Sequence, residues 1–171
     1  MIFIINTFSF VIENMKAKVY IETSIISYLA AKQSRDLIVA ANQQITHEWW
    51  DNRRNLFDLF SSSLVIEEAS KGDSDAANKR LAILNNINII GLNPEIMKFA
   101  GMIINGRILP TKASDDAIHI SVAIIYSFDY LLTWNCKHIA NAEIQKQILK
   151  LANKFGYEMP VICTPYELLG E

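Results

Sequence analysis

Short segments with the composition of β-strands alternate with longer segments of helical periodicity along most of this chain. The strand-like segments are 18–22 (KVYIE), 87–92 (INIIGL), 129–134 (DYLLTW) and the start of 161–169 (VICTPYELL), which goes on into a short terminal helix. Helical segments lie between successive strands. Because parallel strands need crossover connections of this kind, the alternation predicts an α/β fold with a parallel sheet covered on both faces.

The helical segments are bounded by residues that favour helix ends. Residues 93–106 begin with Asn93 as a cap and Pro94 at the first helical position, and they end at Gly106. Residues 76–87, 114–126 and 142–156 are also expected to be helical, and so is the long segment 36–60. Residues 61–68 (SSSLVIEE) predict a short strand that runs into a helix. In the long segment, Trp49 and Trp50 follow the apolar stripe, so we expect packing rather than base stacking.

Length and composition indicate one domain. The chain has 171 residues, of which 51% are hydrophobic, and this is enough for a substantial core. No repeat or linker indicates a second domain. Residues 15–171 are therefore expected to form a single domain, whereas residues 1–14 are interpreted as an N-terminal extension or a misassigned start, with Met15 as the alternative beginning. The apolar residues 2–12 are too short for a membrane span and lack a signal-peptide pattern.

Charge and cysteine content restrict the partners and the compartment. The formal net charge is −2 and no basic block is present, so a nucleic acid would have to be held locally or through a metal. Cys136 and Cys163 lie far apart and have no paired spacing, which is typical of reduced thiols. We expect both to be small buried side chains without a chemical role. We expect a cytoplasmic protein that does not associate with a membrane.

Acidic residues recur where the expected strands end. Glu22 ends the first strand, Glu68 follows the predicted strand 63–66, Asp116 opens the helix 114–126, and Asn135 follows the strand 129–134. The carboxyl ends of parallel strands share one edge of the sheet, where ligands usually bind. Carboxylates gathered without basic partners repel one another unless a cation lies between them. The pattern predicts a site for a hard divalent metal.

Each of these acids also has an interpretation that needs no ligand. Glu22 can cap the following helix, and the residues alone leave both interpretations open. Glu67 is expected to be the surface member of its pair with Glu68. Asp115 and Asp116 both suit a helix start, and Asp116 is the stronger ligand candidate because it leads into the buried face.

Three further residues are ambiguous. His119 lies three residues after Asp116 on the same side of the helix, but a histidine among isoleucines is more often a hydrogen-bonded core residue. His138 on a turn is more often a surface residue, and Thr133 is compatible with ordinary strand packing.

Four segments together resemble the PIN-domain ribonucleases, and in particular the VapC-like toxins of toxin–antitoxin pairs. They are VYIETSII, SSLVIEEASKGD, SDDAIHISVAI and DYLLTWNCKHIANAEI, and the resemblance extends from about Lys18 to Gly170. It implies a three-layer α/β/α sandwich with a central, mostly parallel sheet. It also implies a carboxylate cluster that holds Mg²⁺ or Mn²⁺ for hydrolysis of RNA phosphodiester bonds.

The resemblance assigns roles to individual positions. The catalytic and metal-binding carboxylates fall on Glu22, Glu68 and Asp116. The fourth acidic position of the family falls on Asn135. The supporting positions fall on Thr23, Ser24, Thr133, Asn135 and His138, of which His138 is a candidate contact to RNA phosphate.

Two of these positions depart from the family pattern. Glu22 stands where aspartate is usual and is one methylene longer, which displaces its oxygens from a geometry that Mg²⁺ tolerates poorly. Asn135 removes a formal charge. Three carboxylates are enough for one metal ion, and the number of ions stays open.

The expected function is metal-dependent cleavage of single-stranded RNA, with an antitoxin as protein partner and a homodimer as the assembly. The alternative is a catalytically degenerate PIN domain that binds RNA or protein. A phosphatase would need an Asp-x-Asp pair where the chain has ETS, and a dinucleotide-binding domain would need a glycine-rich turn. Candidate local phosphate contacts are Arg35, Arg53, Arg54, Lys112 and Lys137.

Overall fold

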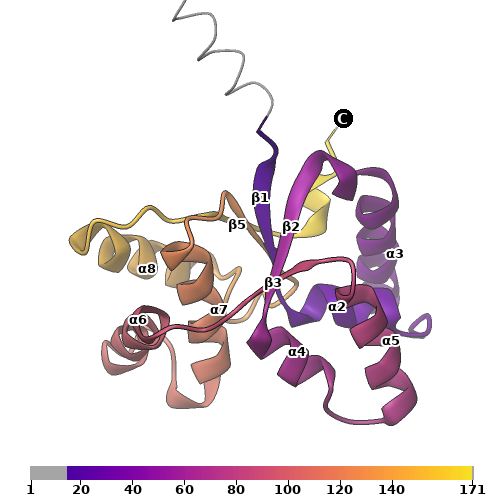
Figure 1. The fold of residues 1–171 in the computed structure, drawn as a ribbon, viewed down its shortest axis with the longest axis horizontal. Helices are drawn as coiled ribbons and strands as arrows, with labels where there is room; N and C mark the ends of the chain where they lie inside the picture. Colours follow the sequence, from indigo (N-terminus) through magenta and orange to yellow (C-terminus); the bar gives the residue numbers. More distant parts are fainter. Residues whose placement is uncertain (1–14, 171) are drawn as a thin grey trace, which may run out of the picture.

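A five-stranded parallel sheet forms the centre of the protein and carries helices on both faces. The computed structural model describes residues 15–170. The strand order is β3-β2-β1-β4-β5, and every neighbouring pair is parallel. Figure 1 shows α2, α3 and α5 on one side of the sheet and α6, α7 and α8 on the other. The predicted three-layer α/β/α sandwich is confirmed, and the sheet is parallel throughout.

Strands and helices follow each other in the order expected from the sequence. The strands are β1 (Ala17–Ile21), β2 (Phe57–Ser62), β3 (Asn88–Ile90), β4 (Tyr130–Leu132) and β5 (Val161–Cys163). The helices are α2 (Thr23–Ala30), α3 (Leu37–Asn52), α4 (Ser63–Ala69), α5 (Ser74–Leu84), α6 (Pro94–Asn105), α7 (Ser114–Ile125) and α8 (Ala142–Lys154). Short 3₁₀ turns are formed by Arg54–Leu56, Thr111–Ala113 and Pro165–Leu168.

Strand β1 occupies the middle of the sheet because it is apolar on both faces. Val19, Tyr20 and Ile21 are fully buried. Ala17 to Tyr20 pair with β2, and Val19 to Ile21 pair with β4. Continuous burial is typical of central strands in parallel sheets. The carboxyl end of β1, where Glu22 follows, therefore lies in the middle of the sheet edge.

Side-chain caps fix the ends of several helices as predicted. The side chain of Asn93 accepts a hydrogen bond from the backbone N–H of Ile96, and Pro94 occupies the first turn of α6. Helix α8 is capped by Asn141 and is followed by Gly156, whose φ of 76° lies in the left-handed region. Helix α7 is buried along most of its length, as its apolar sequence predicts.

The prediction for residues 36–68 was wrong in part. Helix α3 ends at Asn52, and residues 57–62 form strand β2 instead of continuing the helix to residue 60. The predicted strand at residues 63–66 is the first part of helix α4. Leu56 and Phe60 have the spacing of an apolar helix face, and the β-branched Val65 and Ile66 are typical of strands, which explains both errors. Glu68 consequently lies within a helix and not directly after a strand.

Packing explains the tryptophan pair, as expected. Trp49 is fully buried, and its ring lies 5.9 Å from that of Phe57. Trp50 is partly buried and packs against the guanidinium of Arg54, 5.1 Å from the ring centroid. Arg54 precedes β2 and lies at the amino end of the sheet, so it is remote from the edge where the acids lie. A phosphate contact of Arg54 would therefore lie away from that edge.

Within residues 15–170 both cysteines are free, but only Cys163 is buried; Cys136 is exposed, contrary to the expectation. No helix in this part of the chain is both long and apolar enough to cross a membrane. The interpretation of residues 1–14 as an extension concerns residues outside those described.

Candidate active site

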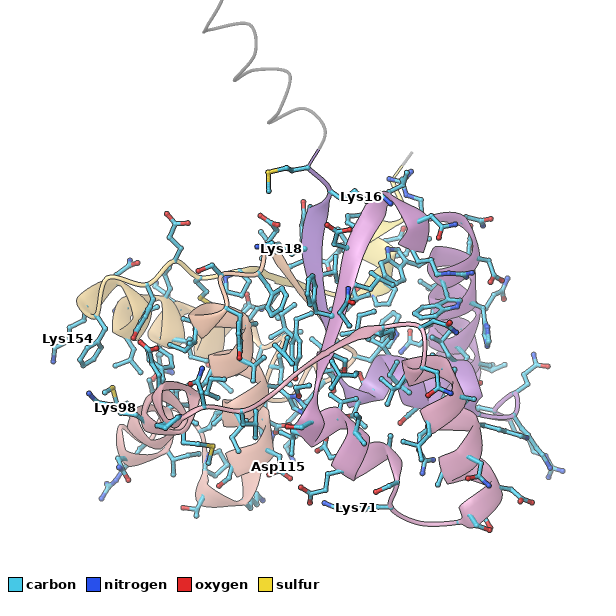
Figure 2. The ribbon with its side chains drawn as sticks, in the orientation of Figure 1. Lys16, Lys18, Lys71, Lys98, Asp115 and Lys154 are labelled. Carbon is cyan, nitrogen blue, oxygen red and sulfur yellow. The ribbon has the colours of Figure 1, made fainter. Side chains whose placement is uncertain are left out.

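The predicted site residues come from four elements at the carboxyl edge of the sheet. Glu22 directly follows β1, Glu68 lies in the last turn of α4, Asp116 lies in the first turn of α7, and Asn135 follows β4. This edge is the lower one in Figure 2, where the labelled Asp115 and Lys71 are found. The topology therefore brings together residues that are up to 113 positions apart in the sequence, from 22 to 135.

Glu22 caps helix α2. Its side chain is 4% exposed, and Oε2 accepts a hydrogen bond from the backbone N–H of Ser24 at 3.0 Å. Oε1 accepts a second hydrogen bond from the Ser24 hydroxyl. An anion at this position also meets the positive end of the helix dipole. The capping role that the sequence allowed for Glu22 is thus present in the structure.

Ser24 connects the end of β1 to the segment after β4. Its hydroxyl oxygen accepts a hydrogen bond from the backbone N–H of Trp134 at 2.8 Å. In the same segment the buried hydroxyl of Thr133 accepts the backbone N–H of Asn135 at 2.8 Å. Ser24 and Thr133 therefore shape the loop that presents Asn135.

Glu68 accepts two side-chain hydrogen bonds on one oxygen. Oε2 receives the hydroxyl of Thr23 and lies 3.0 Å from Nε2 of His119. Burial alone would raise the pKa of the Glu68 carboxyl, but the hydrogen bond and charge of His119 and the bond from Thr23 outweigh it. The pKa therefore lies below its usual range, and Glu68 is ionised at neutral pH.

Asp116 is bound on both oxygens. Oδ1 accepts the side-chain amide of Asn135 at 2.8 Å, and Oδ2 lies 2.7 Å from Nδ1 of His138. The backbone N–H of His138 donates in turn to Oδ1 of Asn135 at 3.1 Å. His138 is therefore a partner of Asp116 and not the plain surface residue that is most common on a turn.

His119 is the residue whose importance the sequence understated. It is 2% exposed, as expected of a core histidine, but it contacts Glu68 with Nε2 and the hydroxyl of Tyr20 with Nδ1, at 2.8 Å. Burial lowers the pKa of His119, but the bond to Glu68 and the charges of Glu22, Glu68 and Asp116 raise it above its usual value. Among these carboxylates, Glu68 contacts the imidazole directly.

The spacing of residues in the sequence indicated that His119 lies near Asp116 and that Lys71 lies near Glu67. His119 follows Asp116 by three positions on a helix, which places both on one face. Lys71 follows Glu67 by four positions, and its ammonium lies 3.0 Å from that carboxylate. Glu67 is exposed, as predicted for the surface member of its pair. Asp115 is also exposed, whereas Asp116 is partly buried.

Comparison with solved structures places this arrangement in a known fold. VapC20 of Mycobacterium tuberculosis, a toxin that cleaves the sarcin-ricin loop, aligns with a TM-score of 0.54 and 12% identity over 72% of this chain and 95% of its own. VapBC2 of Rickettsia felis, solved with a DNA fragment from its promoter, aligns with a TM-score of 0.50 and 16% identity over 86% of this chain and 98% of its own.

The chain has a VapC-like fold. The PIN-like fold that the sequence motifs predicted is thereby confirmed. No family model matches the sequence, and no curated protein matches it either. At this level of identity the VapC-like fold establishes the architecture, and the role of each site residue depends on the geometry of this chain.

The donor types at the edge of this VapC-like fold suit a divalent cation, and in this structure each carboxylate is hydrogen-bonded to protein groups. Carboxylate oxygens are the ligands that Mg²⁺ and Mn²⁺ prefer. Within residues 15–170, however, no three side chains of the types His, Cys, Asp and Glu are grouped as a metal site. Each acid instead has protein partners: Ser24 bonds to Glu22, Thr23 and His119 to Glu68, and Asn135 and His138 to Asp116.

Proposed function

We propose that the protein is a metal-dependent endoribonuclease that hydrolyses phosphodiester bonds of single-stranded RNA. Its carboxylates are Glu22, Glu68 and Asp116. The observation that carries this proposal is that all three lie at the carboxyl edge of the parallel sheet of a VapC-like fold, where ligands of such sheets usually bind. One solved protein with this fold is an RNA-cleaving toxin, which supports the same chemistry here.

The residues of the site hold the acids in defined orientations. Ser24 fixes Glu22, and Thr23 and His119 fix Glu68 through one oxygen. Asn135 and His138 fix Asp116, and Thr133 supports Asn135. Orientation of this kind lowers the cost of arranging the reacting groups in the transition state. A bound Mg²⁺ or Mn²⁺ would polarise the scissile phosphate and lower the pKa of an attacking water.

Asn135 and His138 are well placed to control access to Asp116. The side-chain amide of Asn135 donates a hydrogen bond to Asp116, and Nδ1 of His138 lies within hydrogen-bonding distance of it. A cation or substrate that binds Asp116 therefore competes with these two partners. In this proposal His138 turns from Asp116 to the RNA phosphate when RNA is bound.

The substrate and partners follow from the same proposal. A site open at a sheet edge, without a helix that reads a duplex groove, suits unstacked single strands. We propose a cognate antitoxin as the protein partner, which the VapBC2 complex of the same fold supports, and a homodimer as the assembly. We also propose that the protein acts in the cytoplasm as a single domain, residues 15–171.

A non-catalytic binding module is the second candidate. The observation that favours it is that both acids have hydrogen-bond partners without a ligand. Glu22 accepts a hydrogen bond as a helix cap, and Asp116 accepts one from an amide. Such a domain would bind RNA or protein at the same edge but would not cleave.

Cleavage of end-labelled single-stranded RNA decides between the two. The protein is incubated with Mg²⁺, with Mn²⁺ or with a chelator, and Asp116→Asn is compared with the matched control Asp115→Asn, which changes an exposed neighbour. The nuclease predicts metal-dependent cleavage that Asp116→Asn loses and Asp115→Asn keeps. RNA binding without cleavage by the folded protein, with either metal, would support the binding module instead.

A further inference from the structure

Three side chains behind Glu68 form, together with it, a continuous chain of hydrogen bonds through the interior. Oγ of Ser62 lies 2.8 Å from the hydroxyl of Tyr20, this hydroxyl lies 2.8 Å from Nδ1 of His119, and Nε2 of His119 lies 3.0 Å from Oε2 of Glu68. Ser62 and Tyr20 are fully buried, and His119 is nearly so. The chain joins the ends of β2 and α4 through β1 and α7.

The direction of the bond to Glu68 follows from the chemistry of its members. An ionised carboxylate only accepts hydrogen bonds, so the proton between Glu68 and His119 belongs to Nε2. Tyr20 then bonds to Nδ1 and to Ser62, which leaves none of the three buried groups without a partner. A buried network in which every polar group is satisfied is rigid and defines one arrangement of its side chains.

One oxygen of Glu68 takes part in this network and the other does not. Oε2 receives both His119 and Thr23, whereas Oε1 has no side-chain hydrogen bond within the described residues. Glu68 is 21% exposed, so it lies between the buried network and solvent. The network therefore holds the carboxylate by its inner oxygen and leaves Oε1 to contact a ligand.

Resting on the proposed nuclease function, we propose that His119 is a positioning residue, supported by Tyr20 and Ser62, that fixes the orientation of the Glu68 carboxylate for the reaction. His119 does not contact the RNA in this proposal. It acts through Glu68, because a carboxylate that rotates freely about its own axis would present Oε1 in the required direction only part of the time. Removal of a residue that orients a metal ligand or catalytic group in this way commonly lowers metal affinity or activity by about 10- to 100-fold.

The test uses three variants of the network and one control. His119→Leu removes both hydrogen bonds at similar volume, His119→Gln keeps a donor toward Glu68, and Tyr20→Phe removes the hydroxyl behind the imidazole. Ser121→Ala is the control, since it removes a buried hydroxyl of the same helix that bonds only to the carbonyl of Ala117. Each variant is first shown to be folded by circular dichroism and urea unfolding.

Single-turnover cleavage and RNA binding are then measured separately with one labelled single-stranded oligoribonucleotide. We expect His119→Leu to cleave about 10- to 100-fold more slowly while its Kd for RNA in chelator stays within about twofold. His119→Gln should recover most of the rate, and Ser121→Ala should match the unchanged protein. A folded His119→Leu variant with normal cleavage would overturn the proposal, and so would a loss confined to RNA affinity.

Imidazole ¹⁵N NMR gives a readout that does not depend on cleavage. If the unchanged protein does not cleave RNA, the proposed function fails, but the network is still tested. We expect the His119 signals to show a protonated Nε2 and to shift in both Glu68→Gln and Tyr20→Phe. Signals that are insensitive to both substitutions would show that His119 does not hold Glu68.

Discussion

The side-chain amide of Asn135 donates a hydrogen bond to Oδ1 of Asp116 across 2.8 Å. This contact joins the segment after β4 to the first turn of α7. It also uses the residue that the sequence resemblance assigns to the fourth acidic position of the PIN-domain pattern. The neutral amide therefore stabilises Asp116 in the absence of a cation, where an aspartate would repel it.

Replacing this amide by a carboxylate is expected to make stability depend on metal. Asn135→Asp loses a hydrogen bond to a charged group and places two carboxylates in contact, which should lower the free energy of unfolding in chelator by about 1.5–3 kcal/mol. A cation that binds the folded state would restore about 2.7 kcal/mol at 100 times its Kd. Thermal unfolding with EDTA, Mg²⁺ and Mn²⁺ measures both effects.

The matched control for this substitution is Asn141→Asp. Asn141 caps α8, and aspartate is an equally good cap. The stability of the Asn141→Asp variant should therefore be insensitive to metal. If Asn135→Asp were as stable as the unchanged protein in EDTA, the contact with Asp116 would contribute little.

Shortening the acid at position 22 is expected to preserve the fold. Aspartate is a strong N-cap, so Glu22→Asp should change the free energy of unfolding by less than about 0.5 kcal/mol, whereas Glu22→Ala should lose about 1 kcal/mol. Urea unfolding at neutral pH compares the two. Equal losses in both variants would mean that the cap of α2 requires the longer side chain.

Removal of the Ser24 hydroxyl is expected to loosen two parts of the site at once. Ser24→Ala deprives the buried Glu22 of one donor and leaves the backbone N–H of Trp134 without its acceptor, with a loss of about 1–3 kcal/mol. Hydrogen exchange of the Trp134 amide should also become faster. Ser70→Ala, which removes an exposed hydroxyl bonded to the carbonyl of Glu67, should leave both measurements unchanged.

The two thiols are expected to differ in reactivity and in their effect on stability. Burial, followed by the charge of Glu167, raises the pKa of the Cys163 thiol from 9.0 to about 12, whereas Cys136 is exposed. Because the folded pKa lies above the unfolded one, the contribution of Cys163 is fully present below pH 9.0 and is lost as pH rises toward 12.

Two measurements test this expectation. A thiol reagent at pH 8 should modify Cys136 in the folded protein and Cys163 only in denaturant. The decline in unfolding free energy above pH 9 should be shallower in Cys163→Ala than in the unchanged protein, and parallel declines would contradict the assignment.

Most of the architecture could be predicted from the sequence because periodicity and caps agree in most segments. The Asn93 cap, Pro94 and Gly156 mark helix ends in the structure as they do in the sequence. The boundary between α3 and β2 could not be predicted, since Leu56 and Phe60 have helical spacing, and sheet pairing with β1 and β3 decides the conformation of residues 57–62.

The location of the acids was predictable, but their partners were not. Parallel topology alone brings the regions of Glu22, Glu68 and Asp116 to one edge. Contacts such as His138 with Asp116, or Tyr20 with His119, depend on side-chain rotamers and on the path of each loop, which a one-dimensional pattern does not contain. The sequence therefore indicated where chemistry is possible and left the hydrogen-bonded state of each acid open.

The central position of the first strand has a consequence for the order of events during synthesis. Strand β1 is made first, but it pairs on one side with β2 and on the other with β4, whose partner residues end at Leu132. Asn135 and His138 come later still. Most of the chain must therefore leave the ribosome before this edge of the sheet is complete, so the candidate site can form only late in synthesis.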